Sequence, residues 1–138
     1  MPEAVFLDTN VIIDLVGNRQ PFVREAVQLF DLAEGGELEL YASSLSIVNT
    51  YYVLRKLMGK EPARQGIAQL LPLVKVLSIT QTVIEQALEM APKDFEDGVQ
   101  YFCASQNIGL SALISRNKQD FPTGKLAVMT PSEYLEGL

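Results

Sequence analysis

Acidic residues stand at several separate places where they could take part in hydrolytic chemistry. Asp8 follows a short apolar run, Asp94 and Asp97 open a later amphipathic segment, and Asp120 lies in a turn near the end of the chain. Carboxylates that a fold brings together repel one another unless a proton or a cation intervenes. Hard divalent ions such as Mg²⁺ and Mn²⁺ accept such oxygen ligands and can activate water against a phosphodiester. The pattern therefore predicts a metal-assisted hydrolytic site.

The composition excludes several other chemistries. Histidine is absent, and cysteine occurs once, at Cys103. Serine and cysteine triads that need histidine, HExxH zinc sites, histidine-pair ribonucleases, intrachain disulfides and thiolate metal clusters are therefore excluded. The formal charge of −6, from 17 acidic and 11 basic residues, also argues against a broad basic surface for nonspecific nucleic-acid binding.

Length and composition predict one ordinary domain spanning residues 1–138. The chain is 48% hydrophobic and 20% charged, which disfavours disorder. Its first residues show no basic n-region, and no apolar stretch reaches the ~18 residues of a membrane span. A single thiol suits a reducing compartment, so we expect a cytoplasmic protein without a membrane segment.

Short apolar runs alternate with amphipathic segments along the chain. Strands are expected at 4–7, 38–42, 74–79, 110–115 and 126–130, and helices at 10–16, 21–33, 44–58, 62–71, 80–90 and 94–106, with a short one from Pro131. Thr9 or Asn10 is the expected cap of the first helix. Regular alternation of this kind predicts an α/β fold with a parallel sheet covered by helices on both faces.

Ligands of an open parallel sheet collect outside the carboxyl ends of its strands, near the reversal in strand order. Polar residues stand at those expected ends, at 8–10, 43–44 and 115–117. A spacing of three places Asp94 and Asp97 on one helix face, but it equally fits a capping box. Asp8 as a plain helix cap and Asp120 as a plain turn residue also stay open at this point.

Basic residues are concentrated between residues 51 and 75, where five of them face a single acid, Glu61. Arg55 and Lys56 belong to this group. The segment predicts an ordinary solvated helical hairpin, a rim that contacts phosphates with Tyr51 or Tyr52 as stacking surfaces, or a docking face for an acidic partner.

Four segments resemble the motifs of PIN-domain proteins, the metal-dependent nucleases that include toxins of the VapC type. They are the segments 5–14, 43–49, 94–104 and 113–121, which occur in the family's order and span nearly the whole chain. The resemblance implies a three-layer α/β/α fold with a central five-stranded parallel sheet. It also implies an endoribonuclease that cleaves single-stranded RNA by water attack, leaving a 5′-phosphate and a 3′-hydroxyl. A small antitoxin and a homodimer are the partners expected from it.

The resemblance also assigns roles to individual residues. It implies that Asp8 and Asp97 bind Mg²⁺ or Mn²⁺ and that Asp120 completes the catalytic group, with Asp94 as a further candidate ligand. The residues expected to orient these ligands or to contact phosphate are Asn10, Asn49, Ser115 and Asn117. The residues expected at an RNA-contacting rim are Arg55, Lys56 and Arg116.

One departure from the family pattern concerns Asn49, which stands where many members carry a metal-binding Glu. The loss of a charge predicts weaker magnesium binding and removes a possible water-activating base. Asp94 could compensate, activity could persist with manganese preferred, or the chain could be a binding module with attenuated or no catalysis. A phosphoacceptor domain of flavodoxin-like fold is a poor alternative, because the expected strand 74–79 supplies no aspartate.

Overall fold

A five-stranded parallel sheet forms the centre of the protein. The computed structural model describes residues 2–90, 94–107 and 109–138. The strands are β1 (Glu3–Leu7), β2 (Leu38–Ser43), β3 (Val74–Leu77), β4 (Ala112–Ile114) and β5 (Ala127–Met129). Their order is β3-β2-β1-β4-β5, and every neighbouring pair is parallel. The sheet predicted from the sequence is confirmed.

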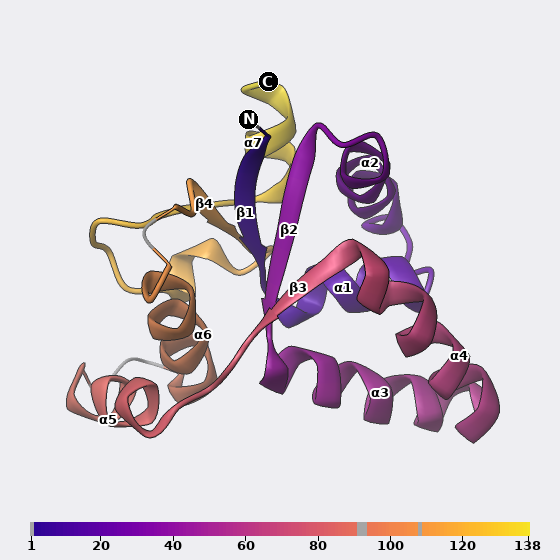
Figure 1. The fold of residues 1–138 in the computed structure, drawn as a ribbon, viewed down its shortest axis with the longest axis horizontal. Helices are drawn as coiled ribbons and strands as arrows, with labels where there is room; N and C mark the ends of the chain where they lie inside the picture. Colours follow the sequence, from indigo (N-terminus) through magenta and orange to yellow (C-terminus); the bar gives the residue numbers. More distant parts are fainter. Residues whose placement is uncertain (1, 91–93, 108) are drawn as a thin grey trace.

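Helices cover both faces of this sheet, which confirms the three-layer α/β/α fold. They are α1 (Thr9–Val16), α2 (Val23–Glu34), α3 (Ser44–Met58), α4 (Lys60–Leu70), α5 (Gln81–Met90), α6 (Phe95–Ser105) and α7 (Pro131–Glu136). Two 3₁₀ turns occupy Leu71–Leu73 and Lys118–Asp120. Figure 1 shows α1, α2 and α4 on one side of β1 and β2, and α5 and α6 on the other. None of the helices in the described ranges is long and apolar enough to cross a bilayer.

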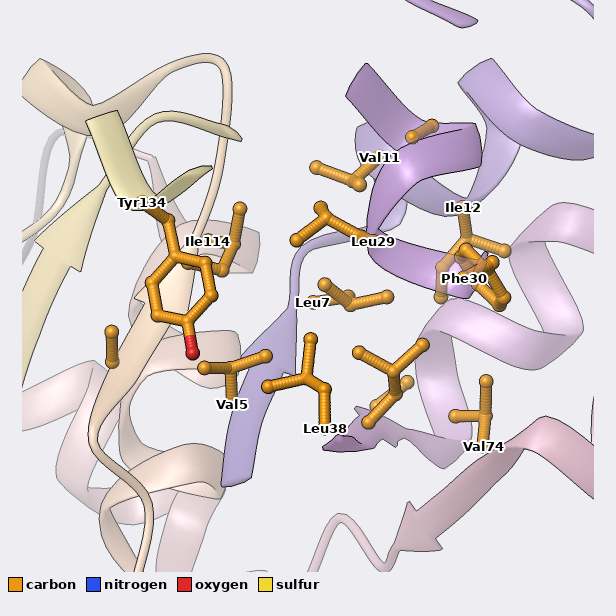
Figure 2. Packing of buried hydrophobic residues seen from close by; sticks show 14 of the residues in the cluster. Val5, Leu7, Val11, Ile12, Leu29, Phe30, Leu38, Val74, Ile114 and Tyr134 are labelled. Carbon is orange, nitrogen blue, oxygen red and sulfur yellow. The ribbon is translucent and has the colours of Figure 1, made fainter. Parts of the chain in front are cut away.

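The core is divided by the sheet into two parts, as the period of two in a strand requires. Val5 and Leu7 of β1 pack with Ile114 of β4 against α1, α2 and α7 (Figure 2). Phe6 of β1 and Leu113 of β4 point to the opposite face and pack with α5 and α6. All five side chains are fully buried. Burial on both faces explains why the first strand is a continuous apolar run in the sequence.

Two helix starts differ by two residues from the sequence-based expectation, and the other differences are smaller. The helix expected from Pro21 begins at Val23, because Pro21 and Phe22 form a turn before it. The helix expected from Pro62 begins at Lys60, directly after Gly59, whose φ of +93° ends α3. A proline fits within this first turn because its missing N–H would have no partner inside the helix.

The reversal in strand order lies between β1 and β4, and it determines where the site forms. From β1 the chain builds outward through β2 to β3, whereas β4 and β5 extend the sheet on the other side. Leu7 is paired with Ile114 at the carboxyl ends of the two strands. The N–H of Asp8 donates to the Ile114 carbonyl at 2.9 Å, and the N–H of Ser115 donates to the Met129 carbonyl at 2.9 Å. Asp8 and Ser115 therefore emerge side by side at the switch point.

Candidate active site

Asp8 is a buried carboxylate held between β1, α1 and β4. Its side chain is 5% exposed. Oδ1 accepts from the Thr9 N–H at 2.8 Å, and Oδ2 accepts from the Ser115 hydroxyl at 2.8 Å. The expectation that Thr9 or Asn10 caps α1 is wrong, because Asp8 itself occupies the N-cap position. Capping alone does not account for the residue, since its second oxygen is bound by a different strand.

Burial raises the pKa of Asp8 above its usual range. The hydrogen bonds from Ser115 and Thr9 oppose this effect, whereas the charges of Glu96 and Asp94 add to it. The carboxylate is therefore placed where its negative charge is poorly stabilised by the protein alone.

Asp97 is the second acid of the site and lies in the first turn of α6. Burial raises its pKa to about 7, and the charges of Asp8, Asp94, Asp120 and Glu96 contribute to the increase. Four acids expected from the sequence, from three distant parts of the chain, therefore share one electrostatic environment. Asp94 also caps α6, because its Oδ1 accepts from the Asp97 N–H at 3.2 Å.

Asn49 lies beside this acid group and contacts a residue that sequence reasoning missed. Its Nδ2 donates to Oε1 of Glu96 at 3.2 Å, across α3 and α6. Glu96 is adjacent to Asp97 in the sequence, but a face argument based on a spacing of three leaves it out. The departure at position 49 thus places an amide against a carboxylate, where a glutamate would oppose two like charges.

Ser115 and Asn10 orient the Asp8 carboxylate. The Ser115 hydroxyl, which donates to Asp8, accepts from the Asn117 N–H at 3.0 Å and from Asn10 Nδ2 at 3.4 Å. The Asn10 Oδ1 accepts from the Arg116 N–H at 3.4 Å. Asn117 thus contributes through its backbone. These contacts join the first turn of α1 to the segment that follows β4.

The three basic residues expected at an RNA rim have different surroundings. Arg116 is held by Asp14, to which its Nε and Nη2 donate at 2.6 and 3.1 Å, and Asp14 is buried. Arg55 and Lys56 are exposed in the last turn of α3. At 1.5 Å per residue they lie about 9 and about 10.5 Å along the helix beyond Asn49. The structure brings neither of them into the acid group, and their contact with RNA stays a prediction.

A buried polar network lies beneath the acids and was also missed from the sequence. The fully buried Gln100 donates from Nε2 to Thr9 Oγ1 at 2.9 Å and to Ser46 Oγ at 2.6 Å. The two hydroxyls lie 2.7 Å apart, and the Ser46 N–H donates to the Ser43 hydroxyl at 3.0 Å. The network joins α1, α3 and α6, which are the helices that carry or adjoin Asp8, Asn49 and Asp97. The one available signal is helical spacing, since Gln100 follows Asp97 by three and Ser46 precedes Asn49 by three.

Ser46 and Thr50 offer a matched test of this network, because both hydroxyls are fully buried on α3. Within the described residues Thr50 Oγ1 has no hydrogen-bond partner, whereas Ser46 has several. Ser46→Ala should lower the free energy of unfolding by about 1–2 kcal/mol, since buried partners lose a bond. Thr50→Val should leave it unchanged or raise it, since the hydroxyl it removes is unpaired. Urea denaturation of both variants measures the difference, and equal losses would contradict the network.

The donor chemistry of the site fits a hard divalent cation. In the described ranges no three acidic, cysteine or histidine side chains lie close enough to make up a metal site by themselves. Mg²⁺ does not require this, because it is commonly bound by one or two carboxylates together with waters and substrate phosphates. Asp8 and Asp97 supply two carboxylates. Burial and nearby acids raise the pKa of both, and a bound cation would stabilise their charged forms.

Comparisons with known proteins show the family to which the chain belongs. A family model described as PIN domain matches residues 4–119. The chain belongs to the PIN-domain family. It is also similar to Ribonuclease VapC1 of Aquifex aeolicus (strain VF5), with 30% identity over 139 residues that cover 97% of this chain and 94% of that protein.

Solved structures similar to this PIN domain include a toxin–antitoxin complex and a DNA-bound VapBC. A toxin–antitoxin complex from Klebsiella pneumoniae has a TM-score of 0.66 at 25% identity, covering 92% of this chain and 97% of that one. The DNA-bound VapBC from Salmonella typhimurium has a TM-score of 0.72 at 18% identity, covering 95% and 99%. At that lower identity the likeness supports the fold alone.

The pKa of Asp97 predicts how the stability of this PIN domain depends on pH. Its folded-state pKa of about 7 lies above the ordinary value of 3.8, so the folded state binds more protons between these values. Without metal, the free energy of unfolding should therefore fall as pH rises from about 4 to 7. Asp97→Asn should flatten this decline and raise the melting temperature at pH 8 by a few degrees. Thermal unfolding in EDTA across this pH range measures both effects, and an unchanged slope would contradict the assignment.

Proposed function

We propose that this protein is a divalent-metal-dependent endoribonuclease of the VapC type that cleaves single-stranded RNA. The observation that carries the proposal is that the charges of Asp8, Asp94, Asp120 and Glu96 all act on Asp97, with Asp8 at the switch point of the sheet. The relationship to Ribonuclease VapC1 supports the same activity. We further propose a cytoplasmic location, a small antitoxin partner, in keeping with the similar toxin–antitoxin assemblies, and a homodimer.

Asp8 and Asp97 would hold the ion, which we propose to be Mg²⁺ or Mn²⁺, with Asp120 and Asp94 nearby. Such an ion, when bound, makes water more acidic and offsets the negative charge of a phosphate. Ser115 keeps one Asp8 oxygen fixed by its hydrogen bond, and Thr9 fixes the other through its backbone. Both contacts define the direction of the carboxylate before substrate arrives. The proposed products are a 5′-phosphate and a 3′-hydroxyl.

Glu96 places a negative charge next to position 49, where Asn49 itself has none. Its carboxylate contacts the Asn49 amide, and its charge contributes to the raised pKa values of Asp8 and Asp97. Glu96 thus adds a carboxylate to the site where the neutral Asn49 adds none. We propose that Glu96, together with Asp94, supplies the negative charge that an asparagine at this position does not.

RNA cleavage with added Mg²⁺ or Mn²⁺ tests the proposed activity. Asp8→Asn and Asp97→Asn should each lower the cleavage rate by at least about a hundredfold. Each replaces a negatively charged carboxylate proposed to bind the metal with a neutral amide, which weakens metal binding and the charge stabilisation that the metal provides. The matched control is Asp31→Asn, which changes an exposed acid on α2 and should leave the rate unaltered. Circular dichroism shows whether each variant is folded. Cleavage that survives both active-site substitutions in folded protein would refute the proposal.

A binding module with attenuated catalysis is the second candidate function, and the neutral Asn49 favours it. A double substitution separates the two candidates. If Glu96 supplies the missing charge, Glu96→Gln should weaken Mn²⁺ binding about tenfold, and Asn49→Glu added to it should restore much of the loss. Asn49→Glu alone should then change metal affinity by less than about threefold, since it brings two carboxylates together.

Isothermal titration with Mn²⁺ measures these affinities, and RNA cleavage is followed in parallel. A large gain in both metal affinity and cleavage for Asn49→Glu alone would instead show that the natural site is attenuated.

A further inference from the structure

An open cavity of about 410 Å³ is lined by none of the proposed metal ligands. Its walls come from the turn before α2, from α2 itself, from the residue after Ser115 and from the start of α7. The residues used below are Phe22, Glu25, Arg116, Thr130 and Ser132. In this region α2 packs against α7.

The cavity is at the same edge of the sheet as the metal ligands. Arg116 follows β4 by two residues, and Thr130 directly follows β5. Ser115, which precedes Arg116, donates to Asp8, and the Arg116 N–H donates to Asn10. The cavity and Asp8 are therefore linked through the consecutive residues Ser115 and Arg116.

Phe22 provides a flat, rigid platform on one wall. Its side chain is 40% exposed, and the Arg116 guanidinium carbon lies 3.8 Å from the ring centroid. The guanidinium is fixed in turn by its two bonds to the buried Asp14. A stack held in this way loses little conformational freedom when a planar group is added to it. Base stacking on aromatic side chains is the common means of holding single-stranded RNA.

Charge determines which part of a nucleotide fits. The positive charge of Arg116 is balanced by Asp14, so the cavity has little attraction left for a phosphate. Glu25 contributes a carboxylate whose Oε1 accepts from the Ser132 hydroxyl at 3.4 Å. This wall favours a neutral planar group that donates hydrogen bonds. Guanine meets the requirement best, because its N1–H and N2–H₂ form a two-donor edge that matches a carboxylate.

We propose that this cavity is a nucleobase subsite for the RNA substrate and that it prefers guanine. The base stacks on Phe22 and donates from N1 and N2 to Glu25. The proposal deepens the ribonuclease function and rests on it for its biological meaning. Binding itself needs neither a metal nor cleavage, so the two can be tested separately.

The test is titration of the whole protein in EDTA with GMP, IMP, AMP and UMP, followed by NMR chemical shifts or calorimetry. GMP should bind about tenfold more tightly than IMP, which lacks the 2-amino group, because a hydrogen bond to a charged acceptor is lost. Phe22→Ala should weaken GMP binding about tenfold or more, and Phe22→Leu should weaken it nearly as much, because stacking is lost. Glu25→Ala should abolish the preference for GMP over IMP.

Leu88→Ala serves as the control, since it removes an exposed large apolar side chain on α5 and should leave GMP binding unchanged. Three results would overturn the proposal: no nucleotide binding at millimolar concentration, equal binding of all four nucleotides, or GMP binding that is insensitive to Phe22→Leu. A capped arginine peptide that binds while the nucleotides do not would assign the cavity to a protein partner. Guanine binding in a protein that cleaves no RNA would refute the nuclease and leave the subsite standing.

Discussion

A carboxylate buried at the end of a central strand is the constraint on which the site depends. Among the residues that the structure describes, Asp8 receives two hydrogen bonds, from a neutral hydroxyl and a backbone N–H, while burial and nearby acids disfavour its charged form. Protein groups alone leave that charge poorly compensated. Each further acid at the same edge adds electrostatic repulsion, which together with burial raises the pKa of Asp97 to about 7. The arrangement is unfavourable for the folded protein alone and favourable for a protein that binds a cation.

The sheet topology is what keeps these repelling groups together. β1 and β4 are neighbours at the switch point, so Asp8 and Ser115 cannot move apart without breaking the central strand pair. Gln100 adds a second restraint, because its amide joins α6 to α1 and α3 below the acids. Within the described residues the side-chain oxygen Oε1 of Gln100 has no hydrogen-bond partner, although the residue is fully buried. A buried amide with incomplete bonding is compatible with folding only where large apolar surfaces on both sides stabilise the surrounding elements.

The sequence predicts the fold well because the relevant signals are local. The continuous apolar runs at 4–7 and 38–42 identify strands buried on both faces, and glycines and prolines mark most element ends. It also predicts that polar residues meet at the carboxyl edge, since topology alone requires this. It could not predict the Asn49–Glu96 contact or the bonds of Gln100, because these depend on how α3 and α6 are rotated against each other. Helix rotation is set by packing over the whole core, and no local pattern records it.

The pairing of Arg116 with Asp14 is another contact that the sequence does not predict, and it reduces the positive charge available near the site. A positive residue next to an active site is naturally expected to attract phosphate, yet here it is paired with the buried Asp14. Loss of the arginine from this position would leave the buried Asp14 charge without its partner, so the pair holds Arg116 in place. Its role is to fix α1 against the segment after β4, which are the two sides of the Asp8–Ser115 bond. With a net charge of −6 and this arginine neutralised, the acid edge would repel RNA until a divalent ion is bound. Metal binding at the proposed site would therefore govern the approach of the substrate as well as the chemistry that follows.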